Sequence, residues 1–346
     1  MSQQALVDIW FCVVTLFWCG YLFLEGFDFG VGMLLPLLGR EGQARSAMIG
    51  SIGPVWDGNE VWLIVAVGAT FAAFPSWYAT LLSACYPVLF LTLVTLILRV
   101  VAFEFRGKAS AAWKRWWDRA LMLGSLVPPL AWGLILTVQL TGLPVTAEGT
   151  FTGRPWDVLG ALPILGAITF AVLFVLHGAT YLSLRTTDPL SARARRTATL
   201  VWVPALVLLC ALFVSLLLTS SGARGHGAFS YALPIATVLA LIAALALHLV
   251  RRDGLAFLAT GLVVVGLVVT LFLGLYPRVV VSSIGAGDTL TALGTASAHY
   301  SLSVLSVAAL IFAPLVILYQ AWTYWVFRKR LSSRPAERPR AAVQKT

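Results

Sequence analysis

Residues 255–275 read LAFLATGLVVVGLVVTLFLGL, a stretch without a single charge, and this kind of run decides the fold. About 20 apolar residues match the length of a helix that crosses the hydrocarbon core of a membrane. A strand of a membrane barrel would instead show about 10 residues of alternating character. A helix also satisfies its own backbone hydrogen bonds in lipid. The stretch therefore predicts a membrane-spanning helix.

The remainder of the chain repeats this pattern. Its residues are 60% hydrophobic and 11% charged, and its mean hydropathy is +0.90. The sequence predicts an all-α polytopic membrane protein with one transmembrane helical domain, residues 1–327, and a basic, disordered cytoplasmic tail, residues 328–346. Nine spans are predicted: residues 8–28, 57–75, 79–101, 120–140, 158–183, 199–219, 230–249, 255–275 and 302–327.

The formal charge of +10 indicates membrane topology rather than a nucleic-acid partner. If the N-terminus lies outside, the connections that face the cytoplasm, together with the C-terminal tail, carry 20 of the 24 Lys and Arg residues. The asymmetry predicts an N-out, C-in protein, because Lys and Arg concentrate on the cytoplasmic side. The cytoplasmic segments in this topology are residues 29–56, 102–119, 184–198, 250–254 and the tail from Arg328.

Carboxylates in a chain this apolar are candidates for function. Glu25 and Asp28 lie at the inner end of the first predicted span, and Asp57 and Glu60 share a helical face at the start of the second. The third span ends with a further acid and an arginine. The topology predicts one depth for six residues: Glu25, Asp28, Asp57, Glu60, Arg99 and Glu104.

Two interpretations of these six residues stay open. Carboxylates desolvated in a helix bundle can exchange protons near neutral pH, so a cluster with one arginine suits a proton path. Alternatively, the acids only cap helix ends and pair with Arg99, Arg40 or Arg45 at the interface. Asp57 follows Pro54 and can also serve as the N-cap of its helix.

Other residue types give no separate catalytic or metal site. Trp56 and Trp62 suit an aromatic belt at the membrane interface or, with Asn59 between them, a contact with quinone, lipid or haem. The four histidines form no pair at i and i+4, and His177, within the fifth predicted span, is the one worth testing as a haem ligand. The four cysteines have no metal-ligand spacing and are interpreted as buried thiols. Gly26 and Gly30 predict close approach of a neighbouring helix.

Two motifs carry a resemblance to a known family. Gly26-Phe-Asp-Phe-Gly-Val-Gly-Met33 and Ile52-Gly-Pro-Val-Trp-Asp-Gly-Asn-Glu-Val-Trp-Leu63 resemble subunit II of the cytochrome bd quinol oxidases, including the cyanide-insensitive branch. The resemblance spans nearly the whole chain. Further matches are Phe71-Ala-Ala-Phe-Pro75, Ala102-Phe-Glu-Phe-Arg-Gly-Lys108, Gly124-Ser-Leu-Val-Pro-Pro129, Gly178-Ala-Thr-Tyr-Leu182 and Tyr319-Gln-Ala-Trp-Thr-Tyr-Trp325.

The resemblance implies a terminal respiratory oxidase of the bacterial cytoplasmic (inner) membrane. Such an oxidase oxidises quinol, reduces O2 to water and takes protons from the cytoplasm, so that it is electrogenic without pumping. The b-type and d-type haems would belong to a partner, subunit I, and this chain would bind no cofactor alone and hold no catalytic residue or metal. It also implies membrane lipids, a structural quinone in some members and small single-span accessory subunits.

The resemblance assigns roles to particular residues. Asp57 matches the family acid implicated in a proton path toward the haems, and Asp28 and Arg99 match two further family positions. Glu104 keeps a carboxylate where relatives carry Asp. The architecture implied is two four-helix bundles plus a peripheral helix.

Two other functions remain as alternatives. A proton-coupled secondary transporter would need a binding site near the middle of the membrane, built on broken helices. A structural membrane scaffold would use the acids only as caps.

Overall fold

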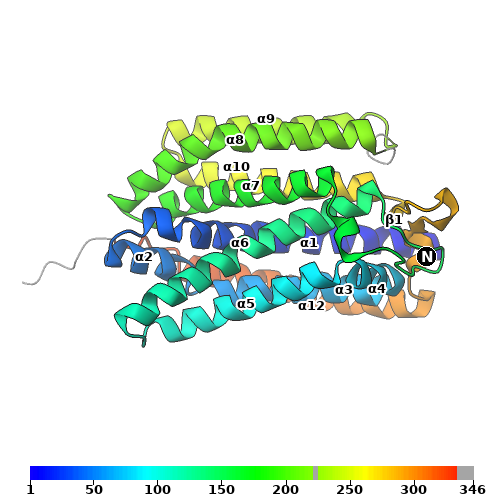
Figure 1. Cartoon of the computed structure of the whole chain (residues 1–346), viewed down its shortest axis with the longest axis horizontal. Coiled ribbons are helices and arrows are strands. Elements are labelled where there is room, and N and C mark those ends of the chain that lie inside the picture. The colour runs from blue at the N-terminus through cyan, green and yellow to red at the C-terminus, as the bar shows by residue number, and fades with distance from the viewer. Residues whose placement is uncertain (221–224, 333–346) are drawn as a thin grey trace, which may run out of the picture.

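Long helices make up most of the described part of the chain, residues 1–220 and 225–332, in this computed structural model (Figure 1). The prediction of an all-α polytopic protein is confirmed. The helices are α1 (Gln3–Leu38), α2 (Gly42–Ile52), α3 (Trp56–Ala73), α4 (Pro75–Ala84), α5 (Tyr86–Arg106), α6 (Ala111–Thr141), α7 (Ala161–Arg185), α8 (Leu190–Thr219), α9 (Phe229–Leu249), α10 (Asp253–Leu275), α11 (Ala292–Thr295) and α12 (His299–Val326).

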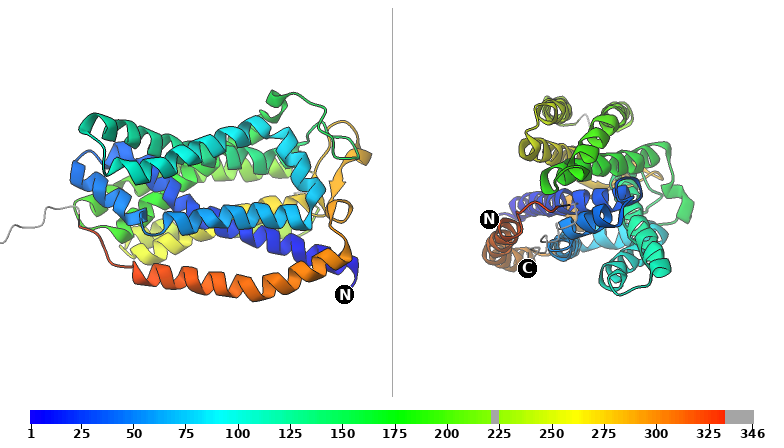
Figure 2. Two further views of the ribbon diagram at one scale, coloured as in Figure 1. Left: turned by 90° about the horizontal axis from the view of Figure 1, so that it is seen from below. Right: turned by 90° about the vertical axis from the view of Figure 1, so that its left-hand side faces the viewer.

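Helix α1 runs through the centre of the molecule. It packs against α3 and α6 on one side and against α7 and α10 on the other. Figure 1 shows α8 and α9 as an outer layer over α7 and α10. Helix α12 lies outside the other helices and contacts α1 and α3, as the left view of Figure 2 shows. The arrangement is two groups of helices joined by α1, with α12 at the periphery.

Eight helices in the described ranges are long and apolar enough to cross a membrane. Helices α3 and α4 give a ninth span only if they count together, and they are bent by 119° at the break. The predicted third span, residues 79–101, is wrong at its start, because α4 ends at Ala84 and α5 begins at Tyr86. Pro75 and Pro87 occupy the first turns of α4 and α5, where a missing backbone N–H is tolerated.

Helix α1 is much longer than the predicted span of residues 8–28. Its 36 residues reach Leu38, so Asp28 lies about 15 Å before the end of the helix at 1.5 Å per residue. The interpretation of Glu25 and Asp28 as end caps is therefore wrong. Helix α1 continues past both carboxylates, and their side chains are buried inside the bundle.

The two ends of the molecule differ in structure. At the end that holds the N-terminus, the two long connections pair through Leu143, whose N–H donates to Val281 O at 2.9 Å. Strands β1 (Arg278–Val280) and β2 (Leu290–Thr291) and the short helices η1 (Pro155–Val158) and η2 (Ala286–Asp288) lie in these connections. Helix α2 lies at the opposite end.

Small residues bring α1 and α7 into backbone contact. A Cβ at Gly30 would collide with the Phe174 backbone oxygen and would lie 2.8 Å from Gly178 Cα. A Cβ at Gly26 would lie 2.9 Å from the Phe174 ring. The prediction that Gly26 and Gly30 admit a neighbouring helix is confirmed, and that helix is α7.

Replacing Gly30 with alanine is expected to destabilise the protein by about 1–3 kcal/mol, because backbone atoms cannot move aside as a side chain can. Thermal unfolding of the detergent-solubilised protein measures the loss. Gly68→Ala is the matched control, since a Cβ at Gly68 in α3 meets nothing within 4 Å. An unchanged unfolding temperature for Gly30→Ala would contradict this packing.

The cysteine prediction is correct for two residues and wrong for two. Cys19 and Cys85 are buried, whereas Cys12 is exposed and Cys210 is half-buried. An apolar span has outward faces as well as buried ones, and hydropathy does not distinguish them.

Candidate functional site

A buried arginine joins two carboxylates between α1, α3 and α5. Arg99 Nη1 lies 3.4 Å from Glu25 Oε2 and 3.3 Å from Glu60 Oε1. The side chains of Arg99 and Glu25 are fully buried, and that of Glu60 is 19% exposed. The Arg99 guanidinium also lies over the Phe29 ring, 4.9 Å from its centroid. Together with Asp28, these residues form the acid cluster: Glu25, Asp28, Glu60 and Arg99.

Close packing of α6 covers the arginine. A Cβ at Gly124 would lie 2.6 Å from Arg99 Cβ and 2.5 Å from the Thr95 backbone oxygen. Among the described residues, Arg99 Nε and Nη2 and both carboxylate oxygens of Glu25 have no hydrogen-bond partner. Buried polar atoms of this kind favour ordered water, which also carries protons between carboxylates.

Asp28 connects the cluster to the peripheral helix through an amide. Asn59 Nδ2 donates to Asp28 Oδ2 at 2.6 Å. Asn59 Oδ1 accepts from Gln320 Nε2 at 2.9 Å and from the Tyr324 hydroxyl at 2.7 Å. Asp28 and Asn59 are fully buried, and Gln320 is 8% exposed. Three helices, α1, α3 and α12, therefore meet at one amide.

The structure brings together four of the six residues that were predicted to converge. Asp57 and Glu104 are exposed and lie outside the buried acid cluster, and their place in a proton path stays a prediction. Glu104 follows Arg99 by five residues, which turns it about 140° around α5. Asp57 lies in the first turn of α3, and the N-cap is Val55, so the capping interpretation is wrong as well.

Of the pairing partners named in the alternative interpretation, Arg99 does bind two of the acids, Glu25 and Glu60, but inside the bundle. Arg45 binds Asp118, with Nη1 2.8 Å from Oδ2, and so takes no part in the acid cluster. Sequence reasoning missed Gln320 and Tyr324. The available signal was Gln320, a polar residue near the end of the otherwise apolar predicted span 302–327.

The two tryptophans of the motif have separate surroundings. Trp56 stacks on Phe103 with ring centroids 5.1 Å apart. Trp62 packs over Gly20 of α1 and lines an apolar groove of about 340 Å³ between α1, α3 and α12. Asn59 instead faces Asp28. Contact of Trp56, Trp62 and Asn59 with quinone, lipid or haem stays a prediction.

Comparison with known proteins identifies the family. The sequence model described as cytochrome bd terminal oxidase subunit II matches residues 6–327. The chain belongs to this family. Cytochrome bd ubiquinol oxidase subunit 2 of Bacillus subtilis strain 168 is 39% identical over 333 residues, which cover 96% of this chain and 98% of that protein. Cytochrome bd-I ubiquinol oxidase subunit 2 of Escherichia coli K12 is 31% identical and covers 98% of both chains.

A solved structure shows the same fold. It is described as the structure of bd oxidase from Geobacillus thermodenitrificans, with a TM-score of 0.73 and 19% identity. The match covers 94% of this chain and 100% of that one. This subunit II is therefore a multi-pass membrane component of an oxidoreductase complex, and its family implies a subunit I partner and haems in the complex.

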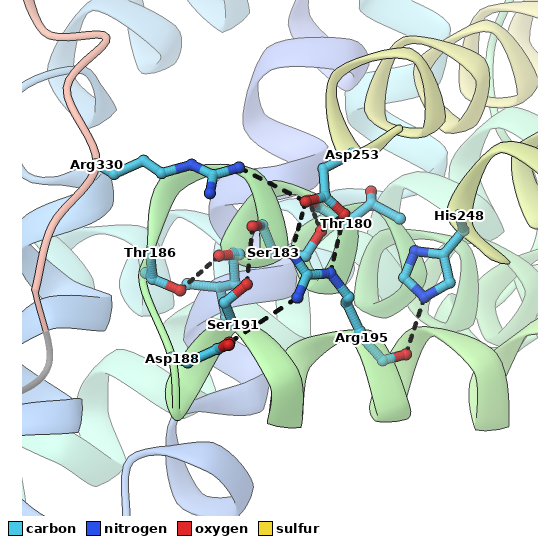
Figure 3. Close-up of polar contacts among 10 residues, drawn as sticks. Thr180, Ser183, Thr186, Asp188, Ser191, Arg195, His248, Asp253 and Arg330 are labelled. Carbon is cyan, nitrogen blue, oxygen red and sulfur yellow. Dashed lines mark hydrogen bonds and ion pairs between the residues drawn. The ribbon is translucent and has the colours of Figure 1, made fainter. Parts of the chain in front are cut away.

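A second ion cluster lies where α7 ends and α8 and α10 begin (Figure 3). Arg195 Nε and Nη2 bind the two carboxylate oxygens of Asp253 at 3.1 and 2.7 Å. Arg330 Nη2 lies 3.6 Å from Asp253 Oδ2, and Asp188 Oδ1 lies 3.8 Å from Arg195 Nη1. Ser183 Oγ reaches the same carboxylate at 3.4 Å. Four charges from distant parts of the sequence are neutralised together.

The beginning of the predicted tail belongs to this cluster. The Leu331 N–H donates to Arg185 O at 2.8 Å, and the Thr187 N–H donates to Leu331 O at 3.1 Å. Leu331, inside the predicted tail, is therefore hydrogen-bonded to the last residue of α7 and to Thr187 just beyond it. Residues 333–346 lie outside the described residues.

Replacing Asp253 with asparagine is expected to cost about 2 kcal/mol of stability, since the variant loses a bidentate charged hydrogen bond and leaves Arg195 without its nearest partner. Asp188→Asn is the control, because Asp188 is 64% exposed and binds the same arginine at the surface. The unfolding temperatures of the two variants are compared with that of the wild type, and the larger decrease is expected for Asp253→Asn. Equal losses would mean that burial of Asp253 adds nothing.

His177 does not fit a haem ligand in this arrangement. His177 Nδ1 lies 2.7 Å from Thr260 Oγ1 and Nε2 lies 3.2 Å from Phe23 O, so both ring nitrogens have partners. The His177 ring stacks on Phe257 at 4.7 Å. Within residues 1–220 and 225–332, no group of three His, Cys, Asp or Glu side chains could hold a metal ion.

Proposed function

We propose that this chain is the non-haem subunit II of a cytochrome bd-type quinol:O2 oxidoreductase and provides a cytoplasmic proton path for the reduction of O2 to water. Family membership supports the role as subunit II. The observation that carries the proton path is the fully buried Arg99 between Glu25 and Glu60. Buried ionisable groups inside a membrane protein are costly and are typical of proton relays.

The proposed orientation has the N-terminus outside and the end with α2 in the cytoplasm of a bacterial inner membrane. The Lys and Arg residues concentrate in the connections at that end. Glu60, which is partly exposed, then links exposed Asp57 to the buried carboxylates. Protons would pass from Asp57 to Glu60 and onward to Glu25 and Asp28.

Arg99 allows the carboxylates to share protons. The carboxylates of Glu25, Asp28 and Glu60 surround one guanidinium. Each proton that arrives or leaves changes the combined charge of the carboxylates by one. The guanidinium stays charged throughout, because arginine is not deprotonated in proteins. It therefore offsets part of the cost of each ionised carboxylate in a poorly solvated site.

The transporter alternative is less well supported by the geometry. The break between α3 and α4 follows Ala73, about 20 Å along α3 from Glu60. The broken helix therefore does not border the acid cluster, as a transporter site would require.

Purification of the tagged chain from its native membrane in mild detergent tests the proposal. We expect a second large membrane subunit to accompany it, with haem bands in the reduced-minus-oxidised visible spectrum. A colourless chain without a partner would contradict the assignment. The small accessory subunits, quinol and lipids proposed for the complex are identified in the same preparation.

A further inference from the structure

Helix α12 lies against the bundle mainly at its two ends. Of its residues only Leu302 and Gln320 are buried. Apolar grooves of about 340 and 450 Å³ flank its middle, on either side of the contact with α1. Near one end, Trp10 Nε1 donates to Ser306 Oγ at 2.9 Å. Near the other end, the polar contact is made by Gln320 and Tyr324 with Asn59.

The contact with Asn59 fixes which way its amide points. An amide oxygen accepts hydrogen bonds and an amide NH2 only donates them. Asn59 Oδ1 already accepts from Gln320 and Tyr324, so Nδ2 must face Asp28. Without the two donors from α12, the amide could rotate and present its oxygen to Asp28.

The two orientations suit different protonation states. An NH2 group donates to an ionised carboxylate, whereas an amide oxygen accepts only from a protonated carboxyl group. We propose that Gln320 and Tyr324 are positioning residues for Asp28, which set the pH range of its proton exchange by holding the Asn59 amide in one orientation. This inference rests on the proposed proton path.

The segment that follows α12 keeps these two side chains in place. The C-terminal strap, residues 327–331, leaves α12 and crosses to α7, where Leu331 is held by the backbone of Arg185 and Thr187. Arg330 adds the ion pair with Asp253, as Figure 3 shows. These contacts with α7 and α10 thus anchor the end of α12 that carries Gln320 and Tyr324.

Other charged or titratable groups around Asp28 come from five helices. Its own helix supplies Glu25, α3 supplies Glu60 and α5 supplies Arg99. Helix α7 contributes Tyr181, beside Arg185, but the Tyr181 hydroxyl donates to Ser51 O at 2.7 Å and is not free for Asp28. Tyr324 is the titratable group from α12. Among these titratable groups, only Tyr324 forms a hydrogen bond with the Asn59 oxygen. Substitutions of Gln320 and Tyr324 therefore leave the other titratable groups around Asp28 unchanged.

The test uses the purified oxidase complex with Tyr324→Phe, Gln320→Leu and the double variant. Quinol-dependent O2 consumption is recorded across the neutral pH range. We expect the pH profile of the double variant to move by about one pH unit to the alkaline side, with maximal turnover within about twofold of wild type. The rotated amide would accept from protonated Asp28, which then keeps its proton to higher pH. Tyr324→Phe is expected to move the profile by a smaller amount.

Tyr319→Phe is the matched control, because Tyr319 lies on the same helix and is 62% exposed. A turnover that falls by the same factor at every pH, or a profile that does not move, would overturn the inference. If the double variant does not assemble, Tyr324→Phe, which removes one oxygen atom, decides by the same criterion. The Asp28→Asn variant separates the two proposals. Full turnover of Asp28→Asn would refute the proton path itself. Lost turnover of Asp28→Asn, together with an unchanged pH profile of Tyr324→Phe, would refute only the role of α12.

Discussion

Replacing Glu25 with glutamine is expected to lower quinol-dependent O2 consumption about 100-fold, while the complex assembles with its normal haem content. Glutamine has nearly the shape of glutamate but cannot take up a proton, and proton transfer by a placed side chain contributes about 10²-fold or more. Glu25 is fully buried beside Arg99, so the protein cannot replace it readily with bulk water. Steady-state oxygen consumption of the purified complex measures the effect.

Glu104→Gln is the control for this variant. Glu104 belongs to the same group of acids in the sequence, but it is exposed and points away from Arg99. Its replacement should leave turnover within about twofold of wild type. If Glu25→Gln also keeps full turnover, the acids are structural, as the scaffold alternative states.

Replacing Arg99 with leucine is expected to cost about 3–5 kcal/mol, because it removes the positive partner of a buried ion pair. Leucine fills part of the space but leaves Glu25, Asp28 and Glu60 without a compensating charge. We expect little assembled complex at the growth temperature. The yield of haem-containing complex per mass of membrane protein measures this loss.

A second variant distinguishes charge from shape at this position. Arg99→Lys keeps the positive charge but loses the planar group that reaches two carboxylates at once. It should assemble in larger amounts than Arg99→Leu and turn over more slowly than wild type. Equal yields of the two variants would mean that the charge of Arg99 does not stabilise the complex.

Much of the fold follows from the sequence because apolar length and charge asymmetry act locally along the chain. The spans of α7, α9, α10 and α12 are predicted within three residues, whereas α8 begins nine residues before its predicted span, because its first turns carry arginines. The end of α1 is not, because Glu25 and Asp28 interrupt the apolar run. Whether such acids end a helix or lie inside a bundle depends on Arg99, which is 74 positions away in the chain from Glu25.

The candidate site is predictable in composition and only partly in geometry. Acids and an arginine in apolar spans are unusual enough to single out Glu25, Asp28, Glu60 and Arg99. Depth alone could not exclude Glu104, since its direction depends on the rotation of α5 about its axis. Gln320 reaches Asn59 across 261 positions of sequence, and no local pattern indicates such a contact.

Proton uptake by the complex tests the central claim most directly. Fully reduced wild-type and Glu25→Gln complexes are mixed with O2 in weakly buffered solution, and a pH-sensitive dye follows the protons taken from the medium. The proton path through Glu25 predicts uptake about 100-fold slower in the variant. Uptake at the wild-type rate in an assembled Glu25→Gln complex would contradict it.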